Sequence, residues 1–462
     1  MPFLLPFPKK AAYDGESVLL PPAIEADAVL LPAADALGGY IKRLFELDVK
    51  KDGGSIRLML DRSLNEEAYT LTVSRDGALI AASTVCGAAH GCSALLSLAK
   101  KDGAMLSLPV CKIQDAPDAG FRSLMVDVAR AFRTVDEIKR YIDLCFFTRL
   151  NTLHLHLADG PHFSMYRLPS KAFPDLTKDG AYTEEDIAEI VSYAAARGIT
   201  ILPEIEMPSH ADPLTSHYPD VFGSHAGGLI CPGKDGVFDA LDTLIGEVCE
   251  LFPASPYVHV GCDEAAYEAW DNCEDCRAYM RSHGIAGAAA LYTHIVDRVT
   301  RMVLAHGRKP IVWEGFPKEG TEMLSRDITV MVFQSTYQTA PSLTSQGFHV
   351  INTSWQPLYI VPSRPKYWER DALYDFRVNK WLFEDAADDS EAMYVTDTDK
   401  LCGSEMCVWE SASFDADSTI LSRTLPVFAE RLWNAEGKET FEEVEAAADA
   451  LHDKTERLRT RA

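Results

Sequence analysis

The stretch Tyr257-Val-His-Val-Gly-Cys-Asp-Glu264 is a short apolar run that ends in two adjacent carboxylates. Its β-branched and aromatic residues predict a buried strand, and the two acids stand where that strand would end. In a barrel of alternating strands and helices, side chains at the carboxyl ends of the strands form the reactive face. The alternative is that Asp263 and Glu264 cap a following helix, whose amino end favours negative charge. The rest of the chain favours the barrel.

Seven further apolar runs follow the same plan, each succeeded by a helical stretch or a long loop. Eight parallel strands is the number that closes a (β/α)8 barrel. With the run already described, the eight are Ser123–Asp127, Thr152–His156, Ile199–Pro203, Tyr257–Val260, Pro310–Trp313, Ile328–Phe333, Phe348–Asn352 and Glu405–Trp409. The clearest intervening helices are predicted over Val135–Thr148, Glu184–Ala196, Asp239–Leu251 and Ala288–Ala305, with a charged surface helix over Phe441–Leu458.

The first part of the chain has a different pattern. Ser55–Leu60 and Tyr69–Val73 alternate as half-buried strands do, and a helical pattern runs from about His90 to Lys101. The turn-rich segment Gln114–Gly120 marks its end. We therefore predict an α/β protein with a (β/α)8 TIM barrel over residues 118–462, preceded by a small α+β N-terminal domain over residues 1–117.

The composition limits the partners. The 462 residues include 44 basic and 69 acidic side chains, a formal charge of −25, which argues against nucleic acid and anionic membranes as ligands. No run approaches the ~20 apolar residues of a membrane span. Met1–Lys10 lacks the order of a secretory signal, and several of the eleven cysteines stand in apolar segments. These features predict a reduced, cytoplasmic protein, and they leave its oligomeric state open.

Polar and aromatic residues gather directly after the predicted strands. Helix capping alone does not account for eight independent runs that all end this way. The pattern indicates one shared site at the carboxyl face of the barrel. The residues are Asp127 and Arg130, His156 and Asp159, Glu204, Glu206 and His210, Asp263 and Glu264, Trp313 and Glu314, Gln334, Tyr359, and Trp409 and Glu410.

Several of these segments, in this order, resemble the family-20 glycoside hydrolases, the β-N-acetylhexosaminidases. The resemblance runs from about Gly87 to Trp433 and covers the whole barrel. Several ordered signatures at barrel spacing are much more specific than any one of them. The segments are Ala89–Leu96, Phe121–Asp127, Asn151–Asp159, Pro203–His210, His259–Glu264 and Val408–Glu410.

The resemblance implies an exo-acting, retaining β-N-acetylhexosaminidase that needs no cofactor. Its substrate would be a small carbohydrate ending in β-linked N-acetylglucosamine or N-acetylgalactosamine. The 2-acetamido oxygen of the sugar would attack its own anomeric carbon and form an oxazolinium ion that water opens. An intramolecular nucleophile is already at high effective concentration, so the protein supplies none.

The resemblance also implies the catalytic roles. Glu264 would be the general acid and then the base, with a pKa raised above its usual value, while Asp263 stays ionised and accepts the acetamide N–H. Because neighbours on a strand point to opposite faces, both can reach one sugar only if the chain leaves strand geometry there. Tyr359 would bond the acetamide oxygen, and Asp159 and His210 would be coupled to the acid.

The remaining predicted site residues bind the sugar. By the same resemblance, Arg122 and Glu410 would hold the ring hydroxyls, Trp409 would form the floor, and Trp313 would wall the acetamide pocket. Trp355 is a further candidate for the pocket lining, but it carries no family motif, and we expect it instead to pack in the core or in a loop. No metal ligand belongs to this predicted site.

Four features depart from the family pattern. Asp159-Gly-Pro-His-Phe replaces the doubly acidic segment that is common after the second strand. Cys262 stands where glycine is usual before the acid pair, and Val361 stands near Tyr359 where an acid is common. No aromatic residue clearly follows the sixth strand. These positions bear on how the pocket treats O4 and O6 of the sugar, and the sequence leaves open which N-acetylhexosamine is preferred.

Three other functions compete. A barrel-type metal hydrolase could use His154 and His156, on one face of a strand, with His210 and Asp159. A non-catalytic sugar-binding barrel would need the aromatic residues but not the acids. A retaining glycosidase with its own carboxylate nucleophile could use one of two other strand-end acids, Glu314 or Glu204.

One further motif has the spacing of zinc ligands. Cys273-Glu-Asp-Cys276 places two thiols three residues apart. A structural zinc site needs four ligands, and no second pair follows in the sequence. We therefore expect these cysteines to cap and pack a helix, although the sequence does not settle whether they bind metal.

Overall fold

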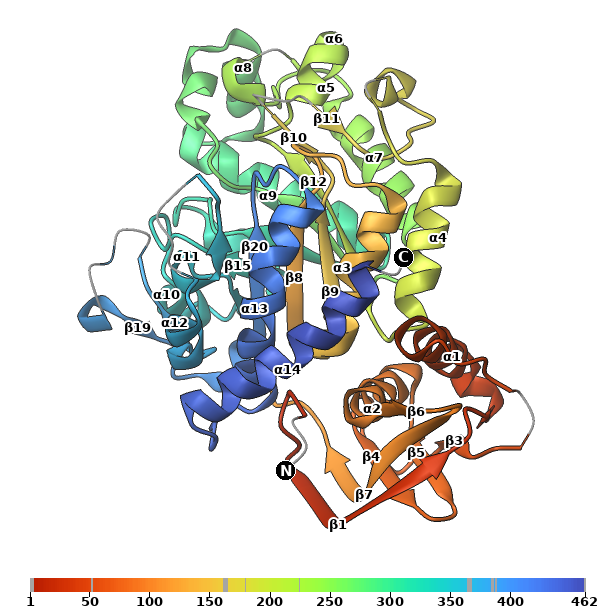
Figure 1. Cartoon of the computed structure of the whole chain (residues 1–462). Helices are drawn as coiled ribbons and strands as arrows, with labels where there is room; N and C mark the ends of the chain where they lie inside the picture. Colours follow the sequence, from red (N-terminus) through yellow and green to blue (C-terminus); the bar gives the residue numbers. More distant parts are fainter. Residues whose placement is uncertain are drawn as a thin grey trace.

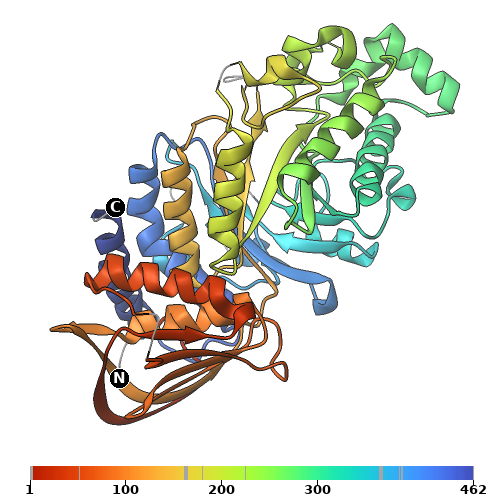
Figure 2. The same ribbon diagram turned by 90° about the vertical axis from the view of Figure 1, so that its right-hand side faces the viewer.

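The computed structural model of the chain describes residues 4–50, 53–160, 165–178, 180–223, 225–363, 368–383, 386 and 389–460. Two parts are evident in Figures 1 and 2, a small part that contains the N-terminus and a larger barrel. The last strand of the small part ends at Asp115, and the first barrel strand begins at Phe121.

The small part is a twisted sheet covered on one face by two helices, α1 (Leu31–Phe45) and α2 (Val85–Leu98). Strand β4 alternates buried and half-buried residues, as predicted for that segment. Helix α2 begins five residues before His90 because the Thr84 side chain caps it at the Gly87 N–H. Helix α1 was not predicted. The strands are β1 (Lys10–Leu20), β2 (Ile24–Ala26), β3 (Ile56–Leu60), β4 (Tyr69–Ser74), β5 (Gly77–Ala82), β6 (Lys100–Asp102) and β7 (Met105–Asp115).

The larger part is a closed barrel of eight parallel strands, which confirms the predicted fold. The strands follow one another in space in chain order, and the pairing of β16 with β20 closes the circle. The two-residue strand β17 (Tyr359–Ile360) lies beside the carboxyl half of β20. The barrel strands are β8 (Phe121–Asp127), β9 (Thr152–His156), β12 (Thr200–Met207), β13 (Tyr257–Gly261), β14 (Lys309–Trp313), β15 (Thr329–Val332), β16 (His349–Asn352) and β20 (Leu401–Val408).

Helices surround the barrel strands (Figure 1). Helix α3 begins where predicted because Thr134 and Glu137 form a capping box. Helix α13 was not predicted, and its buried residues pack against α14 and the barrel. The helices are α3 (Val135–Thr148), α4 (Glu184–Ala195), α5 (Asp212–His217), α6 (Pro219–Phe222), α7 (Val237–Leu251), α8 (Glu274–His283), α9 (Ala288–Ala305), α10 (Ala340–Ser345), α11 (Trp355–Leu358), α12 (Arg370–Asp375), α13 (Phe414–Trp433) and α14 (Phe441–Thr460). Short strand pairs β10 (Ala158–Asp159) with β11 (Met165–Tyr166) and β18 (Lys380–Trp381) with β19 (Met393–Tyr394) lie in the connections.

Helix α14 has one exposed charged face, as its composition predicted, but its other face belongs to the core. Val444, Ala448 and Leu451 are buried against α13. The expectation of a surface helix was therefore correct for one face only, because its apolar residues recur at helical spacing between the charges.

The small part covers the amino end of the barrel. Asp115, at the end of β7, accepts hydrogen bonds from Arg149 at 3.1 Å and from the Trp433 indole at 3.0 Å. Both partners belong to the barrel, and all three side chains are buried. The opposite end of the barrel, where the strands finish, is therefore left for the pocket described below.

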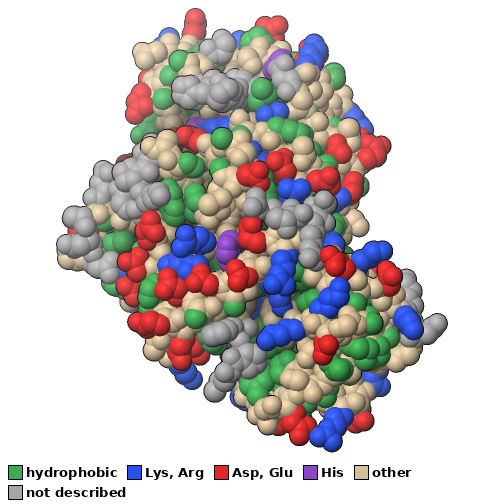
Figure 3. Space-filling view, viewed as in Figure 1, with side chains coloured by type: hydrophobic (Ala, Val, Ile, Leu, Met, Phe, Trp, Pro, Cys, Tyr) green, Lys and Arg blue, Asp and Glu red, His purple; other side chains and the backbone are tan. Residues whose placement is uncertain are grey.

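The surface and the helices add two observations. Acidic and basic side chains are interspersed over the face shown in Figure 3. Over the part of the chain that the structure describes, no helix is both long enough and apolar enough to cross a membrane.

Candidate active site

A pocket opens at the carboxyl ends of the barrel strands. It combines five carboxylates with two histidines, an arginine and several aromatic rings. Its lining residues are Arg130, His156, Asp159, Glu206, His210, Asp263, Glu264, Trp313, Phe333, Gln334, Trp355, Tyr359, Val361, Trp409 and Glu410.

The acid pair reaches this pocket because β13 stops at Gly261 and the backbone then turns sharply. Cys262 has φ 72° and Glu264 has φ 48°, so the chain leaves strand geometry and both acids line the pocket. Gly261 is required at the turn, since a Cβ there would stand 1.8 Å from the Glu206 carboxylate. The departure from strand geometry that the sequence required is therefore present.

Left-handed backbone conformations are concentrated at this pocket. Seven described residues other than glycine have positive φ, and two of them, Glu46 and Arg149, simply end helices. Each such residue costs on the order of 1 kcal/mol, and such strain typically persists at functional sites. The strain here aims side chains that a regular strand or helix would direct elsewhere. The other five are His210, Cys262, Glu264, Ser335 and Glu410.

His210 lies between a buried acid and the acid pair. Its Nδ1 is 3.2 Å from Asp159 Oδ1, and its Nε2 is 3.5 Å from Glu264 Oε2 and 3.8 Å from Asp263 Oδ2. Burial opposes a charge on His210, but the hydrogen bond to Asp159, the charge of Asp263 and the hydrogen bond to Glu264 outweigh it. They raise the pKa of His210 well above its usual value, so the ring is an imidazolium that couples Asp159 to Glu264.

The two acids differ in pKa, in the opposite order to the prediction. Burial, reinforced by neighbouring acids, raises the pKa of Asp263 to about 6. The hydrogen bond with His210 lowers the pKa of Glu264. The reason is position, because the Asp263 side chain is 15% exposed whereas that of Glu264 is 45% exposed at the pocket mouth. In the open pocket, the proton that the pair shares therefore resides mainly on Asp263.

Aromatic rings form the base and one wall. Trp313 and Trp409 have ring centres 6.0 Å apart, and Tyr359 lies 6.0 Å from Trp409. Trp355 stacks on Tyr359 at 4.6 Å and lines the pocket. Of the two positions considered for Trp355, the structure therefore shows the pocket lining and not the expected core or loop packing. Phe333 lies parallel to Tyr359 and supplies an aromatic residue at the end of β15.

The structure contradicts the prediction for Arg122. Its side chain is buried at the amino end of β8, where it donates to Glu67 of the small part at 3.1 Å and to the Arg149 carbonyl. It is an inter-domain residue that lies outside the pocket. The reason is direction, because Arg122 stands at the start of its strand and only residues at the strand's carboxyl end face the pocket.

Arg130 occupies the place predicted for Arg122. It pairs with Asp127 at 3.0 Å and with Asp159 at 2.6 Å, and its guanidinium lies 5.5 Å from the centre of the Trp409 ring. Asp127 also accepts the Glu410 backbone N–H at 3.3 Å. Arg130 and Glu410 both line the pocket, so a cation and an anion stand together beside the aromatic floor.

The barrel interior beneath the pocket holds a second polar network. Both ring nitrogens of His156 are bonded to carboxylates, Nδ1 to Glu204 and Nε2 to Asp159. His154 lies between Glu405, at 3.1 Å, and Glu204, at 3.2 Å. Burial opposes charge on these rings, but the carboxylates raise the pKa of His154 to about 9 and that of His156 to about 10. Both nitrogens of His156 are thus hydrogen-bonded to carboxylates, so this ring offers no free lone pair to a metal.

The two other strand-end acids do not line the pocket. Glu204 is fully buried among the interior histidines and also accepts the Trp313 indole N–H. Glu314 is buried and accepts three backbone N–H groups, from Ser335, Tyr337 and Gln338. Neither carboxylate is placed to attack a bound sugar, so each has a structural role here.

Seven lining residues were given no role in the predicted site, and Trp355 and Val361 are two of them. Three of them, Arg130, His156 and Glu206, follow strand ends in the sequence, and that position was their available signal. Burial and the neighbouring charges of Asp263 and Glu204 raise the pKa of Glu206 well above its usual value, so it stands neutral beside the acid pair. The last two are Phe333 and Gln334, and the amide nitrogen of Gln334 lies 3.4 Å from Glu264 Oε1.

Comparison with models of known protein families identifies the family of this chain. The model for the catalytic domain of glycosyl hydrolase family 20 matches residues 120–436. The chain belongs to glycosyl hydrolase family 20. The model for domain 2 of the same family matches residues 1–116. The resemblance inferred from the motifs is thereby confirmed.

Named relatives and solved structures agree with the family. A β-hexosaminidase of Vibrio furnissii is 31% identical over 345 residues, covering 67% of this chain and 55% of that protein. β-Hexosaminidase 1 of Arabidopsis thaliana is 25% identical, covering 94% and 85%. The family-20 exo-β-N-acetylglucosaminidase of Vibrio harveyi in complex with N-acetylglucosamine has a TM-score of 0.86 at 23% identity, covering 100% of this chain and 78% of that one. A β-N-acetylhexosaminidase of Bacteroides fragilis has a TM-score of 0.81 at 22% identity, covering 96% and 93%.

The extent of these matches limits what passes from relatives to this chain. It spans 55%, 40% and 58% of the first three curated relatives. The solved structures are under 25% identical, so they establish the fold. The activity of this family-20 chain is therefore argued from its own pocket.

Proposed function

We propose that this family-20 chain is an exo-acting, retaining β-N-acetylhexosaminidase that uses the acetamide of its substrate as the nucleophile. The substrate would be a carbohydrate with a terminal β-linked N-acetylglucosamine or N-acetylgalactosamine. The observation that carries the proposal is the pair Asp263 and Glu264, which line one aromatic pocket and both lie within 4 Å of His210 Nε2.

Asp263 supports the acetamide mechanism through an unsatisfied atom. Its Oδ1 is buried and has no hydrogen-bond partner in the protein. Such an oxygen is costly unless a donor reaches it, and an acetamide N–H is a donor of suitable size. An ionised Asp263 there would orient the acetamide and stabilise the positive charge that develops on the oxazolinium ring. Tyr359, at the aromatic base, would hold the acetamide oxygen.

Glu264 would protonate the departing oxygen and then activate water. In the open pocket His210 favours its ionised form, but a bound sugar would remove water from the mouth and disfavour that charge. The same sugar would give Asp263 a hydrogen-bond donor that favours its ionised form. Substrate binding would therefore move the shared proton from Asp263 towards Glu264, where the chemistry needs it.

The sugar ring has matching groups on its other sides. Trp409 and Trp313 offer flat apolar faces, and Arg130 and Glu410 offer a donor fork and an acceptor for vicinal hydroxyls. The presence of Asp263 and Glu264 argues against a protein that only binds sugar, because binding alone does not need this pair of acids. The positions of Glu204 and Glu314 outside the pocket weigh against an enzymic carboxylate nucleophile.

Changing the substrate at C2 tests the proposal directly. We expect an aryl β-N-acetylglucosaminide to react at least ~1,000-fold faster, in kcat/KM, than the matched aryl β-glucoside, because only the former carries the internal nucleophile. The matched glucosaminide with a free amine serves as a second comparison, since it keeps a nitrogen at C2 but no carbonyl oxygen. Equal turnover of glucoside and N-acetylglucosaminide would reject the mechanism.

The pH dependence follows from the raised pKa of Asp263, about 6. Below that pH the pair holds one proton, and above it both acids become charged and no proton remains for the leaving oxygen. For a substrate with a sugar aglycone, kcat/KM should therefore fall about tenfold per pH unit above pH ~6. A dinitrophenyl glycoside, whose aglycone needs no proton, should lack this fall. A flat profile from pH 6 to 8 with the sugar aglycone would contradict the assignment.

The cytoplasm remains a proposal for where the chain acts. It is supported by the eleven cysteines, all of which are free thiols, the form that reducing compartments maintain. Fractionation of the source cells, with N-acetylhexosaminidase activity measured in each fraction, tests it. Recovery of the activity outside the cytosolic fraction would reject it.

A further inference from the structure

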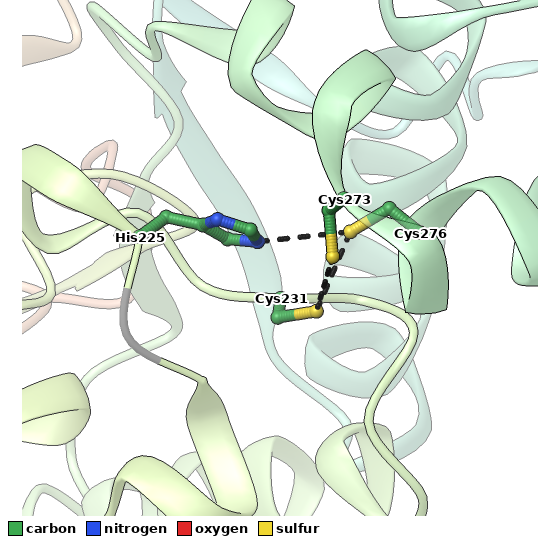
Figure 4. A group of neighbouring side chains, drawn as sticks. All are labelled: His225, Cys231, Cys273 and Cys276. Atoms are coloured by element: carbon green, nitrogen blue, oxygen red, sulfur yellow. Dashed lines mark hydrogen bonds between the residues drawn. The ribbon is translucent and has the colours of Figure 1, made fainter.

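Three thiols and one imidazole converge outside the pocket (Figure 4). His225 and Cys231 come from the loop between α6 and α7, and Cys273 and Cys276 stand at the start of α8. One ligand atom from each lies within 4.8 Å of the other three. These four residues are called the Cys3His cluster below. Among the groups formed by described residues, no other brings three cysteines together.

The Cys3His cluster corrects the interpretation of Cys273 and Cys276. The sequence favoured a capping and packing role for them, because no second pair of ligands follows them, and it left metal binding open. Cys273 does stand at the amino end of α8, but its side chain makes no capping hydrogen bond. The second pair, His225 and Cys231, precedes them in the chain and meets them through the fold.

The distances fit a tetrahedral metal site. Zinc bonds of ~2.3 Å to sulfur and ~2.0 Å to nitrogen give sulfur–sulfur edges of about 3.8 Å and sulfur–nitrogen edges of about 3.5 Å. The Sγ atom of Cys231 lies 3.8 Å from that of Cys273 and 3.4 Å from that of Cys276. The His225 Nε2 is 3.7 Å from Cys276 Sγ. The four side chains therefore already occupy the corners of a site of this size.

The backbone around the cluster is shaped to bring the two pairs together. Gly233 lies so close to α8 that a Cβ there would stand 2.3 Å from the Asp275 carbonyl carbon, so the Cys231 loop needs glycine at this point. The backbone carbonyl of Cys231 accepts the Lys234 N–H in a tight turn. The Lys234 side chain pairs with Asp275 at 3.4 Å. The turn at Cys231 and the amino end of α8 are therefore packed closely against each other. This packing leaves the four ligands little space to rearrange.

We propose that the Cys3His cluster binds a structural zinc ion. Three thiolates and one imidazole are the soft donors that select zinc over magnesium or calcium. All four tetrahedral positions are filled by protein atoms, which leaves none for a water nucleophile, so the metal has no part in bond cleavage.

The position of the cluster indicates the structural role that a zinc ion would have there. The loop that carries His225 and Cys231 continues from the segment of His210, and α8 continues from the segment of Glu264. Trp270, buried between them, donates from its indole to the Ile230 carbonyl at 2.9 Å, and the Ile230 N–H bonds the Pro208 carbonyl. Zinc would fasten these two loops to each other and so hold the scaffold behind His210 and Glu264.

Metal analysis of the purified chain tests the proposal without relying on activity. Protein produced with added zinc and dialysed against metal-free buffer is expected to carry about one zinc ion per chain. The variants Cys231→Ser and Cys273→Ser should lose most of that zinc. Cys402→Ser is the matched control, because Cys402 is partly buried like Cys273 but lies outside the cluster, and it should keep the zinc.

A measurement on the unaltered chain covers the case in which the variants do not fold. After exchange of zinc for cobalt, three thiolate ligands in a tetrahedron should give strong visible bands and a thiolate charge-transfer band in the near ultraviolet. Chelation should lower the midpoint of heat unfolding, and added zinc should restore it. The proposal is overturned if the zinc-supplemented chain carries no stoichiometric metal, if cobalt gives only weak octahedral bands, or if Cys231 is found in a disulfide.

Discussion

Replacing Glu264 by glutamine is expected to lower kcat/KM for an N-acetylglucosaminide with a sugar aglycone by about 100- to 10,000-fold, the usual contribution of a positioned general acid. The amide keeps the size of the side chain and can still contact His210, but it has no proton of suitable acidity to give. With a dinitrophenyl aglycone, which leaves without a proton, the loss in kcat/KM should shrink to less than about tenfold. Initial rates with both substrates measure the difference.

Glu268→Gln is the matched control for this experiment. Glu268 is exposed in the same connection after β13 and does not line the pocket, so the same chemical change there should leave both rates unaltered. Heat unfolding of both variants checks that the fold is kept. An equal loss with both aglycones would mean that Glu264 acts on binding or on structure and that another group supplies the proton.

The barrel could be predicted because its strands carry a strong local signal. Each buried strand is a short apolar run, and each is followed by a polar or aromatic residue, so all eight were located. Helices α1 and α13 were missed for a local reason. Helix α13 contains Pro426, and α1 begins with Leu31-Pro-Ala-Ala and contains two glycines, so both patterns lack ordinary helix signals. Tertiary packing of their buried faces stabilises them instead.

The site was predicted in part, and the errors have one cause. Asp263, Glu264, Asp159 and His210 follow strand ends, and the fold brings them together as that position requires. Arg122 was selected by its neighbouring motif although it stands at the beginning of β8, which faces the small part of the chain. A rule based only on strand ends would have chosen Arg130.

Other features depend on contacts between distant segments. The pKa order of Asp263 and Glu264 is set by their different exposure and by His210, which lies more than fifty residues earlier in the chain. The partners of Cys273 and Cys276 likewise come from a separate loop. Spacing in the sequence carries no signal for either, because in both cases the relevant distance is created by folding.

Replacing Asp263 by asparagine is expected to lower kcat/KM by about 100- to 1,000-fold, the usual cost of removing one preorganised group that stabilises transition-state charge. The amide could still accept the acetamide N–H through its carbonyl oxygen, but it would lose the negative charge opposite the oxazolinium. Unlike the loss at Glu264, this loss should persist with a dinitrophenyl aglycone, because formation of the oxazolinium needs Asp263 whatever group departs. A thiazoline analogue of that intermediate should also bind more weakly. Asp271→Asn, an exposed aspartate in the same connection, is the control and should change neither rate nor affinity. If the loss at Asp263 disappeared with the activated aglycone, Asp263 would be assisting proton transfer, and the acetamide would have no demonstrated part in the reaction.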